Sequence, residues 1–315
     1  MKNGNIDDAE FLERLERIEK SLKLSNKEKE RKIYSFGSIK MDKKSGINGA
    51  MSGKLYEIKG WESSGKSTVS YSIIRNVQKQ GGRTLIIDGE HSLSEDYLIK
   101  LGIDVSKSKL KIYRPNYLEE GFQYIFDVLD QNLFDYILLD SQDSLQPKKV
   151  MEGDVSESAL GLKARFVSLN LPKLINKIDA SNTLFVVISQ IREKIGVMFG
   201  SPNTTSGGNA WKFYAHVRID FSKQVKTDVA ANLTSFKFTK NKLAEPMGSG
   251  EFELIWGKGI NVMKEVLELS IEKGIIIRSG SWYSYKETKL GQGADTICKL
   301  LEDNEELLNE LKQQI

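Results

Sequence analysis

The stretch GWESSGKS, residues 60–67, is the feature that most constrains the fold of this chain. The apolar run KLYEIK precedes it, and residues 65–80 follow with helical periodicity. The chain therefore passes from a strand, through a glycine-rich turn, into a helix. Successive backbone N–H groups at the start of such a helix form an anion-binding nest, and the helix dipole adds positive potential. This order of elements predicts a phosphate-binding loop at the edge of an α/β sheet.

Two positions in this loop have a defined chemistry. Lys66 would reach the β- and γ-phosphates of a nucleotide, and Ser67 would ligate Mg²⁺. A carboxylate that holds Mg²⁺ through water is expected from Asp140, which ends the apolar run DYILLD. The loop motif in this setting is specific for nucleotide binding, whereas many buried strands end in aspartate.

Two further polar side chains end predicted strands and would meet the loop at the same sheet edge. Glu90, in IIDGEH, is placed to orient and deprotonate an attacking water molecule, although capping of the next helix explains it equally well on local grounds. Gln190, which ends VVISQ, is placed to contact a γ-phosphate and to report its presence to the segment that follows.

Short apolar strands alternate with amphipathic helices from residue 54 onward, which predicts an α/β fold with a mainly parallel central sheet covered by helices on both faces. The expected strands span residues 54–59, 83–88, 110–114, 135–140 and 183–189. The expected helices span residues 65–80, 94–101, 118–132 and 161–180. Period-two alternation predicts antiparallel strands that extend the sheet at residues 216–225 and 235–243.

Changes of pattern divide the chain into three parts. Residues 1–34 form an N-terminal oligomerisation helix and a charged linker, and residues 35–258 contain the α/β core. Residues 259–315 form a small α+β domain with the hairpin-like stretch SGSWYSYKETKLGQG and a closing helix.

The N-terminal helix has one apolar face. Phe11, Leu15, Ile18 and Leu22 recur at helical spacing, and Asp7 or Asp8 would cap the helix. An isolated helix of this kind cannot bury its apolar face alone. It must dock on its own chain or on a neighbouring one, and the sequence leaves both open.

The bulk composition narrows the class of protein. The single cysteine, Cys298, excludes an intramolecular disulfide and fits a reducing cytosol. One Cys and two His are too few to form a Cys/His metal-binding cluster. No run approaches the roughly 18 apolar residues of a membrane span, and the charged N-terminus is unlike a signal peptide. The net charge of +3 is weak support for any particular partner. We expect an intracellular protein without a membrane partner.

The stretch IREKIGVMFGSPNTTSGGNAW, residues 191–211, places an apolar patch at the mouth of a loop. Pro202, Gly207 and Gly208 prevent its second half from forming a helix or a central strand. Such a loop cannot bury its apolar residues in a protein core, so they require a partner of another kind.

Taken in order, these motifs resemble those of bacterial RecA-type recombinases. The resemblance is carried by GWESSGKS, IDGEHSL, LLDSQDSLQPK, SQIREKIGVMFGSPNTTSGGNAWKFYAHVR, KFTKNKLAEP and GSWYSYKETKLGQG. It runs from about residue 36 to the C-terminus, and the N-terminal helix is similar to that of the family only in position and character. The longest motif is highly specific, because other P-loop ATPases of related fold do not carry it. The resemblance implies a RecA-type P-loop ATPase core with DNA-binding loops.

The resemblance also implies roles at the nucleotide site. Glu90 would be the catalytic base, Gln190 the γ-phosphate sensor that links ATP to DNA binding, and Tyr97 the aromatic ring that stacks on adenine. Two lysines of the adjacent subunit in a filament would approach the γ-phosphate, as arginine fingers do. The implied catalytic residues are Glu90, Lys66, Gln190, Lys240 and Lys242. The implied nucleotide-binding residues are Gly60, Glu62, Ser63, Ser64, Gly65, Lys66, Ser67, Thr68, Tyr97 and Asp140, and those that serve the metal are Ser67 and, through water, Asp140.

Two loops would face the filament axis and bind DNA. Leu160 in the first loop would wedge near bases, while Arg165 and Ser168 would touch phosphates. The apolar residues of the second loop would lie against the DNA strand without reading its sequence, because every base has a π-face. Phe213 matches a subunit-interface residue that transmits cooperativity. The implied DNA-binding residues are Leu160, Arg165, Ser168, Arg192, Ile195, Val197, Met198, Phe199, Gly207, Gly208 and Asn209.

The implied function is that of an ATP-dependent recombinase for recombination and DNA repair. It would form a helical filament on single-stranded DNA, pair it with homologous double-stranded DNA, and exchange strands, using ATP and Mg²⁺. Its implied location is the cytoplasm, in association with the nucleoid, or the host cytoplasm if the chain is encoded by a phage.

The sequence departs from the family pattern at several points. Trp61 replaces a proline in the phosphate loop, and we expect its side chain to face outward. Ser94 stands where an acidic residue often helps to contact adenine, and Pro172 where a basic residue often touches DNA phosphate. The chain ends at Ile315 without a long acidic tail, which is typical of a phage or mobile-element relative.

Two alternatives belong to other classes. A hexameric helicase or an accessory motor with the same core would use an arginine in trans and would lack the motif at residues 191–211. A DNA-binding scaffold that does not hydrolyse ATP is disfavoured by the intact set of Lys66, Ser67, Glu90 and Asp140.

Overall fold

The computed structural model describes residues 7–21, 29–153, 161–193, 203–205, 210–222, 225–226, 231–245 and 248–315. They fall into two compact units, Met1–Arg31 and Lys32–Ile315. Within the described chain, no helix combines the length and apolar character that crossing a bilayer requires.

The first unit contains the helix α1 (Asp8–Ser21). Asp7, one of the two expected capping residues, accepts the backbone N–H of Glu10 at 2.8 Å. The expected apolar face is present and exposed, since the side chains of Phe11 and Ile18 are 55% and 54% accessible. Leu22 lies outside the described residues. The helix therefore has an apolar face that its own unit does not cover.

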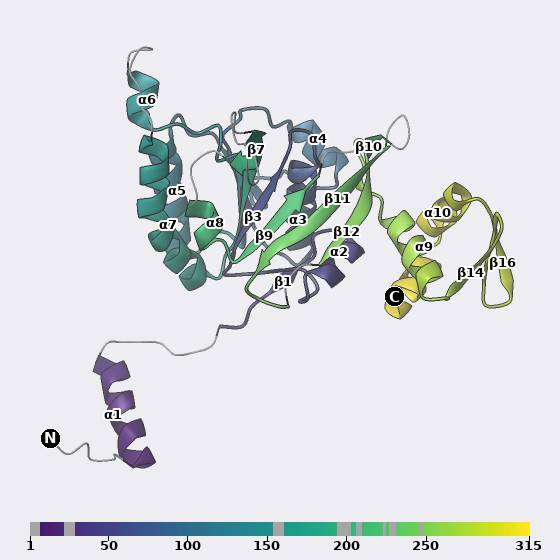
Figure 1. The fold of residues 1–315 in the computed structure, drawn as a ribbon, viewed down its shortest axis with the longest axis horizontal. Coiled ribbons are helices and arrows are strands. Elements are labelled where there is room, and N and C mark those ends of the chain that lie inside the picture. Colours follow the sequence, from purple (N-terminus) through teal and green to yellow (C-terminus); the bar gives the residue numbers. More distant parts are fainter. Residues whose placement is uncertain are drawn as a thin grey trace. The chain divides into compact units, whose positions relative to one another are not determined.

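The second unit contains a central sheet whose strand order among the described residues is β13-β12-β11-β9-β3-β7-β6-β4-β5. Figure 1 labels β12, β11, β9, β3 and β7 of this sheet. The strands from β9 to β5 run parallel: β9 (Val217–Phe221), β3 (Leu55–Gly60), β7 (Leu184–Glu193), β6 (Tyr136–Asp140), β4 (Thr84–Asp88) and β5 (Leu110–Tyr113). Antiparallel strands extend the sheet beyond β9: β11 (Ala231–Asn241), β12 (Ser249–Ile255) and β13 (Gly259–Ile260). Two short strands, β8 (Asn203–Thr205) and β10 (Val225–Lys226), pair with β7 and β11. The predicted mainly parallel α/β sheet is confirmed.

Helices cover both faces of this sheet (Figure 1). Alternate strand residues such as Ile86 and Leu138 pack in one apolar cluster with α3 (Lys66–Lys79). Their neighbours Leu85 and Ile137 point the other way, into a second cluster with α5 (Leu118–Asp130) and α7 (Leu162–Ser181). Every residue of β4 and β6 is buried, as expected for parallel strands covered on both sides. The remaining elements of this core are β1 (Ile33–Tyr34), α2 (Ile39–Lys44), β2 (Ala50–Met51), α4 (Glu95–Lys100), α6 (Lys148–Glu152) and α8 (Ala210–Tyr214).

The C-terminal region has its own apolar core, which includes Val266, Ile297 and Leu311. The expected hairpin is β15 and β16 of a three-stranded antiparallel sheet, and the expected closing helix is α11, preceded by α10. A break at Asn304 separates the two helices, and its side chain accepts the N–H of Leu307 at 3.0 Å. The elements are α9 (Val262–Glu272), β14 (Ile276–Ser279), β15 (Trp282–Tyr285), β16 (Thr288–Gln292), α10 (Ala294–Asp303) and α11 (Glu305–Gln314).

A buried carboxylate joins the C-terminal region to the core. Glu265 of α9 accepts the hydroxyl of Ser38 at 2.5 Å and the backbone N–H of Ile39 at 2.7 Å, so it caps the start of α2. Burial raises the pKa of Glu265 to about 7, although these hydrogen bonds oppose the rise. The division into residues 1–34, 35–258 and 259–315 stays a prediction.

Candidate nucleotide and DNA site

The carboxyl ends of adjacent strands bring the predicted nucleotide-site residues to one edge of the sheet. Gly60, the last residue of β3, is in register with Gln190 of β7. Asp140, the last residue of β6, is in register with Asp88, the last residue of β4. Glu90 follows β4 closely in the chain, and the strand order β3-β7-β6-β4 makes these ends contiguous. The crevice outside the carboxyl ends of parallel strands is where α/β sheets bind ligands.

The phosphate loop turns from β3 into α3 through backbone conformations that few residues adopt. Gly65, which precedes α3, has φ of 88°, and Ser63 has φ of 56°. A Cβ at Gly60 would lie 2.6 Å from Oγ of Ser64 and 2.8 Å from the carbonyl oxygen of Phe221, so a larger residue does not fit. The buried hydroxyl of Ser64 has no hydrogen-bond partner within the described part of the chain. A buried polar group awaiting a partner at the start of a helix fits a bound phosphate.

Lys66 is buried at the first position of α3, with 6% of its surface accessible. Its Nζ donates a hydrogen bond to the carbonyl oxygen of Trp61 at 2.7 Å, across the loop. Burial lowers the pKa of Lys66, and the negative charges of Asp140 and Glu90 oppose that change. An ammonium group held in a water-poor site acts strongly on a nearby phosphate, because the effective dielectric constant is low there.

The side chains expected to serve a metal lie together. Asp140 accepts hydrogen bonds from the hydroxyl of Ser67 and, at 3.2 Å, from Oη of Tyr71. Burial raises the pKa of Asp140 to about 6, and the charge of Glu90 adds to the rise. A buried carboxylate that lacks full charge compensation, beside a hydroxyl, fits Mg²⁺, which prefers oxygen ligands. In the described ranges, no group of three or more His, Cys, Asp or Glu is arranged to hold a metal ion.

Glu90 and Gln190, far apart in the sequence, are joined by a hydrogen bond. Nε2 of Gln190 donates to Oε1 of Glu90 at 2.9 Å, and the hydroxyl of Ser141 donates to the same oxygen at 2.8 Å. The backbone N–H of Gln190 donates to Oδ2 of Asp143 at 2.7 Å. The side chains predicted as base and as phosphate sensor therefore belong to one hydrogen-bonded group. Ser141 and Asp143 were not among the predicted site residues.

An aromatic pair borders the first turn of α3. The ring of Tyr97, in α4, lies 6.5 Å from that of Trp256 and 6.4 Å from that of Tyr71. Its hydroxyl is 3.4 Å from Oγ1 of Thr68. Ser94 is the residue at the N-terminal cap of α4. Trp256, between β12 and β13, is 77% exposed, and no sequence pattern connects this residue to Tyr97.

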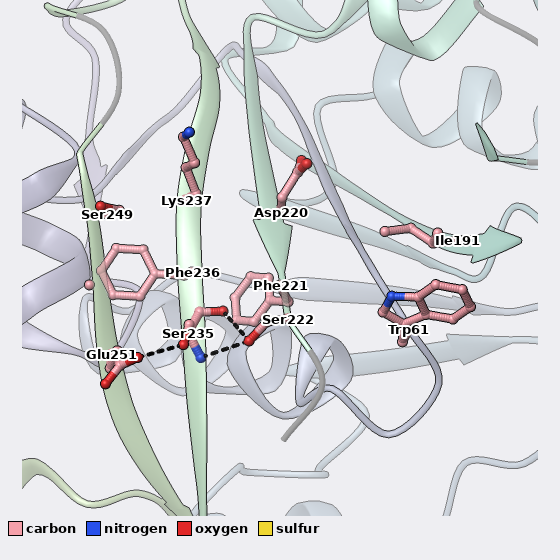
Figure 2. A pocket seen from close by; sticks show the side chains of 11 residues that line it. Trp61, Ile191, Asp220, Phe221, Ser222, Ser235, Phe236, Lys237, Ser249 and Glu251 are labelled. Carbon is pink, nitrogen blue, oxygen red and sulfur yellow. Dashed lines mark hydrogen bonds between the residues drawn. The ribbon is translucent and has the colours of Figure 1, made fainter. Parts of the chain in front are cut away.

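A hollow of about 550 Å³ opens beside the phosphate loop, over β9, β11 and β12 (Figure 2). Trp61 and Ile191 border one side of it, and Figure 2 shows Ser235 and Glu251 on the other, joined by a hydrogen bond of 2.8 Å. Trp61, the departure from the family's loop pattern, therefore contacts the hollow, and the neighbouring Glu62 is exposed. The hollow is lined by Trp61, Ile191, Asp220, Phe221, Ser222, Ser235, Phe236, Lys237, Ser249, Gly250 and Glu251.

Lys240 and Lys242 lie away from the phosphate loop of their own chain. Lys240 is in register with Arg218 of β9, which is in register with Glu57 of β3. Glu57 lies three residues before Gly60, so the two residues are separated by about 10 Å along β3. Lys240 is also two strands away from β3, because β9 intervenes. Lys242 follows the end of β11 and is further still from the carboxyl edge.

The predicted interface residue Phe213 shares a surface with these lysines. It lies on the short helix α8 and is 67% exposed. Nζ of Lys240 donates hydrogen bonds to the carbonyl oxygens of Lys212 and Phe213, at 2.9 Å and 2.8 Å, and so ties β11 to the C-terminal end of α8. Burial lowers the pKa of Lys240, and the positive charge of Lys242 adds to this change. The result is an exposed aromatic ring beside two basic side chains.

Part of the predicted DNA surface lies on described residues. Arg165 and Ser168 are exposed on α7, and Leu169, which the sequence analysis missed, is 70% exposed beside Ser168. The backbone of Arg192 pairs with Thr204 in the ribbon formed by β7 and β8, so part of the expected loop is a short strand. The other predicted DNA-binding residues lie outside the described residues: Leu160, Ile195, Val197, Met198, Phe199, Gly207, Gly208 and Asn209.

These features define a class of protein: a P-loop ATPase built on a mainly parallel sheet, with a carboxylate and an amide hydrogen-bonded to each other at the carboxyl edge. Comparison with protein families narrows the class. The RecA N-terminal domain family matches residues 12–261, and the RecA C-terminal domain family matches residues 264–315.

Individual relatives agree with the family matches. A protein named "Protein RecA" from Bacteroides thetaiotaomicron is 43% identical over 284 residues, which cover 89% of this chain and 86% of the relative. The "Protein RecA" of Porphyromonas gingivalis is 41% identical over 287 residues, covering 90% of this chain and 84% of the relative. That of Chloroherpeton thalassium is 40% identical, with coverage of 90% and 80%.

The chain belongs to the RecA family. It is a recombinase that acts in DNA recombination and repair, and it is a DNA-dependent ATPase. Membership of this family implies nucleotide binding, DNA binding and filament formation. The alternative of a hexameric helicase or accessory motor is disfavoured accordingly.

Proposed function

We propose that the sheet edge around Lys66, Asp140, Glu90 and Gln190 binds ATP with Mg²⁺ and hydrolyses it while the chain is assembled on single-stranded DNA. The observation that carries this proposal is the hydrogen bond from Gln190 to Glu90, next to a phosphate loop with a buried lysine. This hydrogen bond supports the proposal, because it joins a potential base and an amide donor at the sheet edge where the loop begins.

The proposed chemistry uses these groups in turn. The loop N–H groups and Lys66 bind the phosphates, and Glu90 accepts a proton from the water that attacks the γ-phosphorus. The bond from that phosphorus to the bridging oxygen breaks, so that ADP and phosphate form. Ser67, and Asp140 through water, would hold Mg²⁺, which neutralises charge on the β- and γ-phosphates. Gln190 hydrogen-bonds the γ-phosphate and loses this partner when phosphate departs.

Contacts to the adenine ring and two lysines of the neighbouring subunit complete the proposed site. Tyr97 stacks on adenine, with Trp256 beside it, since the aromatic pair borders the first turn of α3. Lys240 and Lys242 act on the γ-phosphate of the neighbouring subunit. The support for this is their position about 10 Å or more from the carboxyl edge of their own sheet, beside the exposed Phe213.

The proposed DNA contacts are independent of sequence. Arg165 and Ser168 meet phosphates, and the apolar residues of segment 194–209 lie against bases of a single strand, which then pairs with duplex DNA. ATP selects the filament state that binds DNA better, and hydrolysis releases it. We place this activity in the cytoplasm.

One experiment tests the proposed function directly. ATP hydrolysis by the full chain is measured with and without single-stranded DNA, and the same samples are viewed by electron microscopy. We expect hydrolysis that depends on DNA, and helical filaments. Rings, or a hydrolysis rate indifferent to DNA, would instead support the motor alternative.

Substitution of Lys242 tests the role in trans. Lys242→Ala is expected to bind nucleotide normally but to lose most DNA-stimulated hydrolysis, because a cation acting across an interface contributes to the transition state and little to ground-state binding. Lys111→Ala, an exposed lysine on the edge strand β5, should keep the wild-type rate. Mixing the Lys242→Ala and Lys66→Ala proteins should give more activity than their sum, because each supplies what the other lacks. A mixture no more active than its components would rule out the trans role.

Phe199 tests the second loop. Phe199→Ala is expected to weaken binding of oligo-dT by about 1–3 kcal/mol at fixed salt, the usual contribution of one base stacked on an aromatic ring. The readout is fluorescence anisotropy of labelled oligo-dT in the presence of a non-hydrolysable ATP analogue. Trp282→Ala, which removes an exposed aromatic ring on β15, is used to detect nonspecific loss. Unchanged affinity of Phe199→Ala would remove this residue from the DNA interface.

A further inference from the structure

Asp143 is a buried carboxylate that the proposed chemistry does not use. It follows the end of β6 by three residues, and only 5% of its surface is accessible. Its Oδ2 accepts the backbone N–H of Gln190 at 2.7 Å. The hydrogen bond is charge-assisted and short, which makes it stronger than an ordinary one between neutral groups.

The reason for this contact lies in the length of two strands. The register between β6 and β7 ends at Leu139 and Val187, whereas β7 continues to Glu193. Beyond the end of β6, the N–H of Gln142 still donates to the carbonyl oxygen of Ile188 at 3.1 Å. Asp143 then supplies an acceptor for Gln190, where the ladder no longer provides one. The side chain thus fixes the backbone of the residue whose amide reaches Glu90.

The same residue is tied to the start of α7. The backbone carbonyl oxygen of Asp143 accepts a hydrogen bond from Nζ of Lys163 at 3.0 Å. Lys163 is the second residue of α7, and Arg165, a proposed phosphate contact, follows it by two positions. Asp143 therefore contacts, through different atoms, the helix that begins after the first predicted DNA loop and the strand that leads into the second.

We propose that Asp143 is a positioning residue that couples DNA contact at the start of α7 to the Glu90–Gln190 pair. When DNA binds and moves the first turn of α7, Lys163 transmits the movement to Asp143. Asp143 in turn sets the position of Gln190, because it holds the backbone N–H of Gln190. The amide of Gln190 then meets the γ-phosphate and Glu90 in the geometry that hydrolysis requires. This inference rests on the roles proposed above for Gln190 and Glu90. By linkage, the same contact makes ATP raise the affinity for DNA, since coupling between two sites is reciprocal.

Two substitutions and a matched control separate this role from a merely structural one. Asp143→Ala removes the acceptor, and Asp143→Asn keeps an oxygen that can accept the N–H of Gln190 while removing the charge. Asp42→Asn is the control, because Asp42 also accepts a backbone N–H, that of Phe36 at 2.8 Å, but lies in α2. The full-length proteins are compared in two measurements. The first is the ratio of the oligo-dT dissociation constants in ADP and in a non-hydrolysable ATP analogue. The second is kcat and KM for ATP with saturating oligo-dT.

For Asp143→Ala we expect the ratio to fall by about tenfold, as the loss of one strong buried hydrogen bond implies. The DNA-stimulated kcat falls by a similar factor, while KM for ATP stays within about twofold of the wild-type value. Asp143→Asn recovers most of both losses, and Asp42→Asn matches the wild type. If Asp143→Ala does not fold, Asp143→Asn still decides the matter, because the neutral acceptor should give a smaller but measurable fall in the ratio.

Two results would overturn the inference: a wild-type ratio in Asp143→Ala, or equal losses in the alanine and asparagine variants. A failure of the proposed function would look different. The wild-type protein itself would then show no hydrolysis, or a ratio of one, whatever stands at position 143.

Discussion

Replacing Lys66 with alanine is expected to abolish DNA-dependent ATP hydrolysis and, with it, the tight ATP-dependent binding of single-stranded DNA. Lys66 is buried at the start of α3, and its ammonium group lies near the carboxylates of Asp140 and Glu90. Removing the cation leaves these negative charges to repel the γ-phosphate. The loss of one such preorganised electrostatic group costs about 10²–10³-fold in kcat, and nucleotide affinity falls as well. Hydrolysis by the wild-type and variant proteins, measured with saturating oligo-dT, tests this directly.

A lysine on β3, the strand that leads into the phosphate loop, gives the matched control. Lys59 of β3 is partly exposed, and its Nζ pairs with Oδ2 of Asp220 at 2.8 Å. Lys59→Ala should therefore keep hydrolysis within about twofold of the wild-type rate, since an ion pair near the surface contributes little. Thermal unfolding of both variants separates a loss of catalysis from a loss of fold. Wild-type turnover by a folded Lys66→Ala protein would overturn the assignment of the phosphate loop.

The sheet and its carboxyl edge could be predicted because short-range patterns determine them. TLIID and YILLD are buried along their whole length, so each appears in the sequence as an unbroken apolar run. The polar residue at or just beyond the end of such a run must lie at the sheet edge, because the next turn begins there. Asp140, Glu90 and Gln190 were placed correctly at one edge on this reasoning alone. Their roles in catalysis stay predictions.

Contacts between distant segments were beyond the reach of such patterns. Asp143 looks like an ordinary polar residue after a strand, and its burial depends on how far β7 runs past β6. Trp256 lies between β12 and β13, and its contact with Tyr97 of α4 joins segments that are far apart in the sequence. Side-chain hydrogen bonds and ring contacts of this kind follow from the three-dimensional packing, and a single sequence carries no local signal for them.

The same limit applies at the C-terminus and in the DNA loops. The closing helix was predicted from its apolar spacing, but the break before it depends on a single cap, Asn304. The short strand β8 was expected to be loop, because its antiparallel pairing with β7 depends on a reversal of the chain between Glu193 and Asn203 that no local pattern indicates. For Leu160 and for the apolar residues 195–199, the prediction still rests on the sequence motif. The Phe199→Ala experiment therefore carries the test of the second loop.

Replacing Glu90 with glutamine should separate ATP binding from ATP hydrolysis. Glutamine has nearly the same shape and keeps a carbonyl oxygen that can accept the hydrogen bonds of Gln190 and Ser141. It cannot accept a proton from the attacking water, so kcat should fall by about 10²–10⁴-fold, the usual contribution of a general base. Nucleotide affinity should be retained, since Lys66 and the loop are untouched. The loss of a negative charge beside the γ-phosphate favours binding further.

The consequence for DNA binding is opposite to that of Lys66→Ala, which makes the pair of variants informative. If hydrolysis is what releases DNA, Glu90→Gln protein should stay on oligo-dT in the presence of ATP for much longer than the wild type, while Lys66→Ala protein should bind it weakly. Dissociation of labelled oligo-dT after dilution into ATP, followed by anisotropy, measures this, and Glu95→Gln, an exposed glutamate at the start of α4, is the control. Equal dissociation rates for the Glu90→Gln and wild-type proteins would mean that hydrolysis does not govern release. A wild-type kcat in Glu90→Gln would remove Glu90 as the base, and the hydrogen bond between Glu90 and Gln190 would then have to be explained by structure alone.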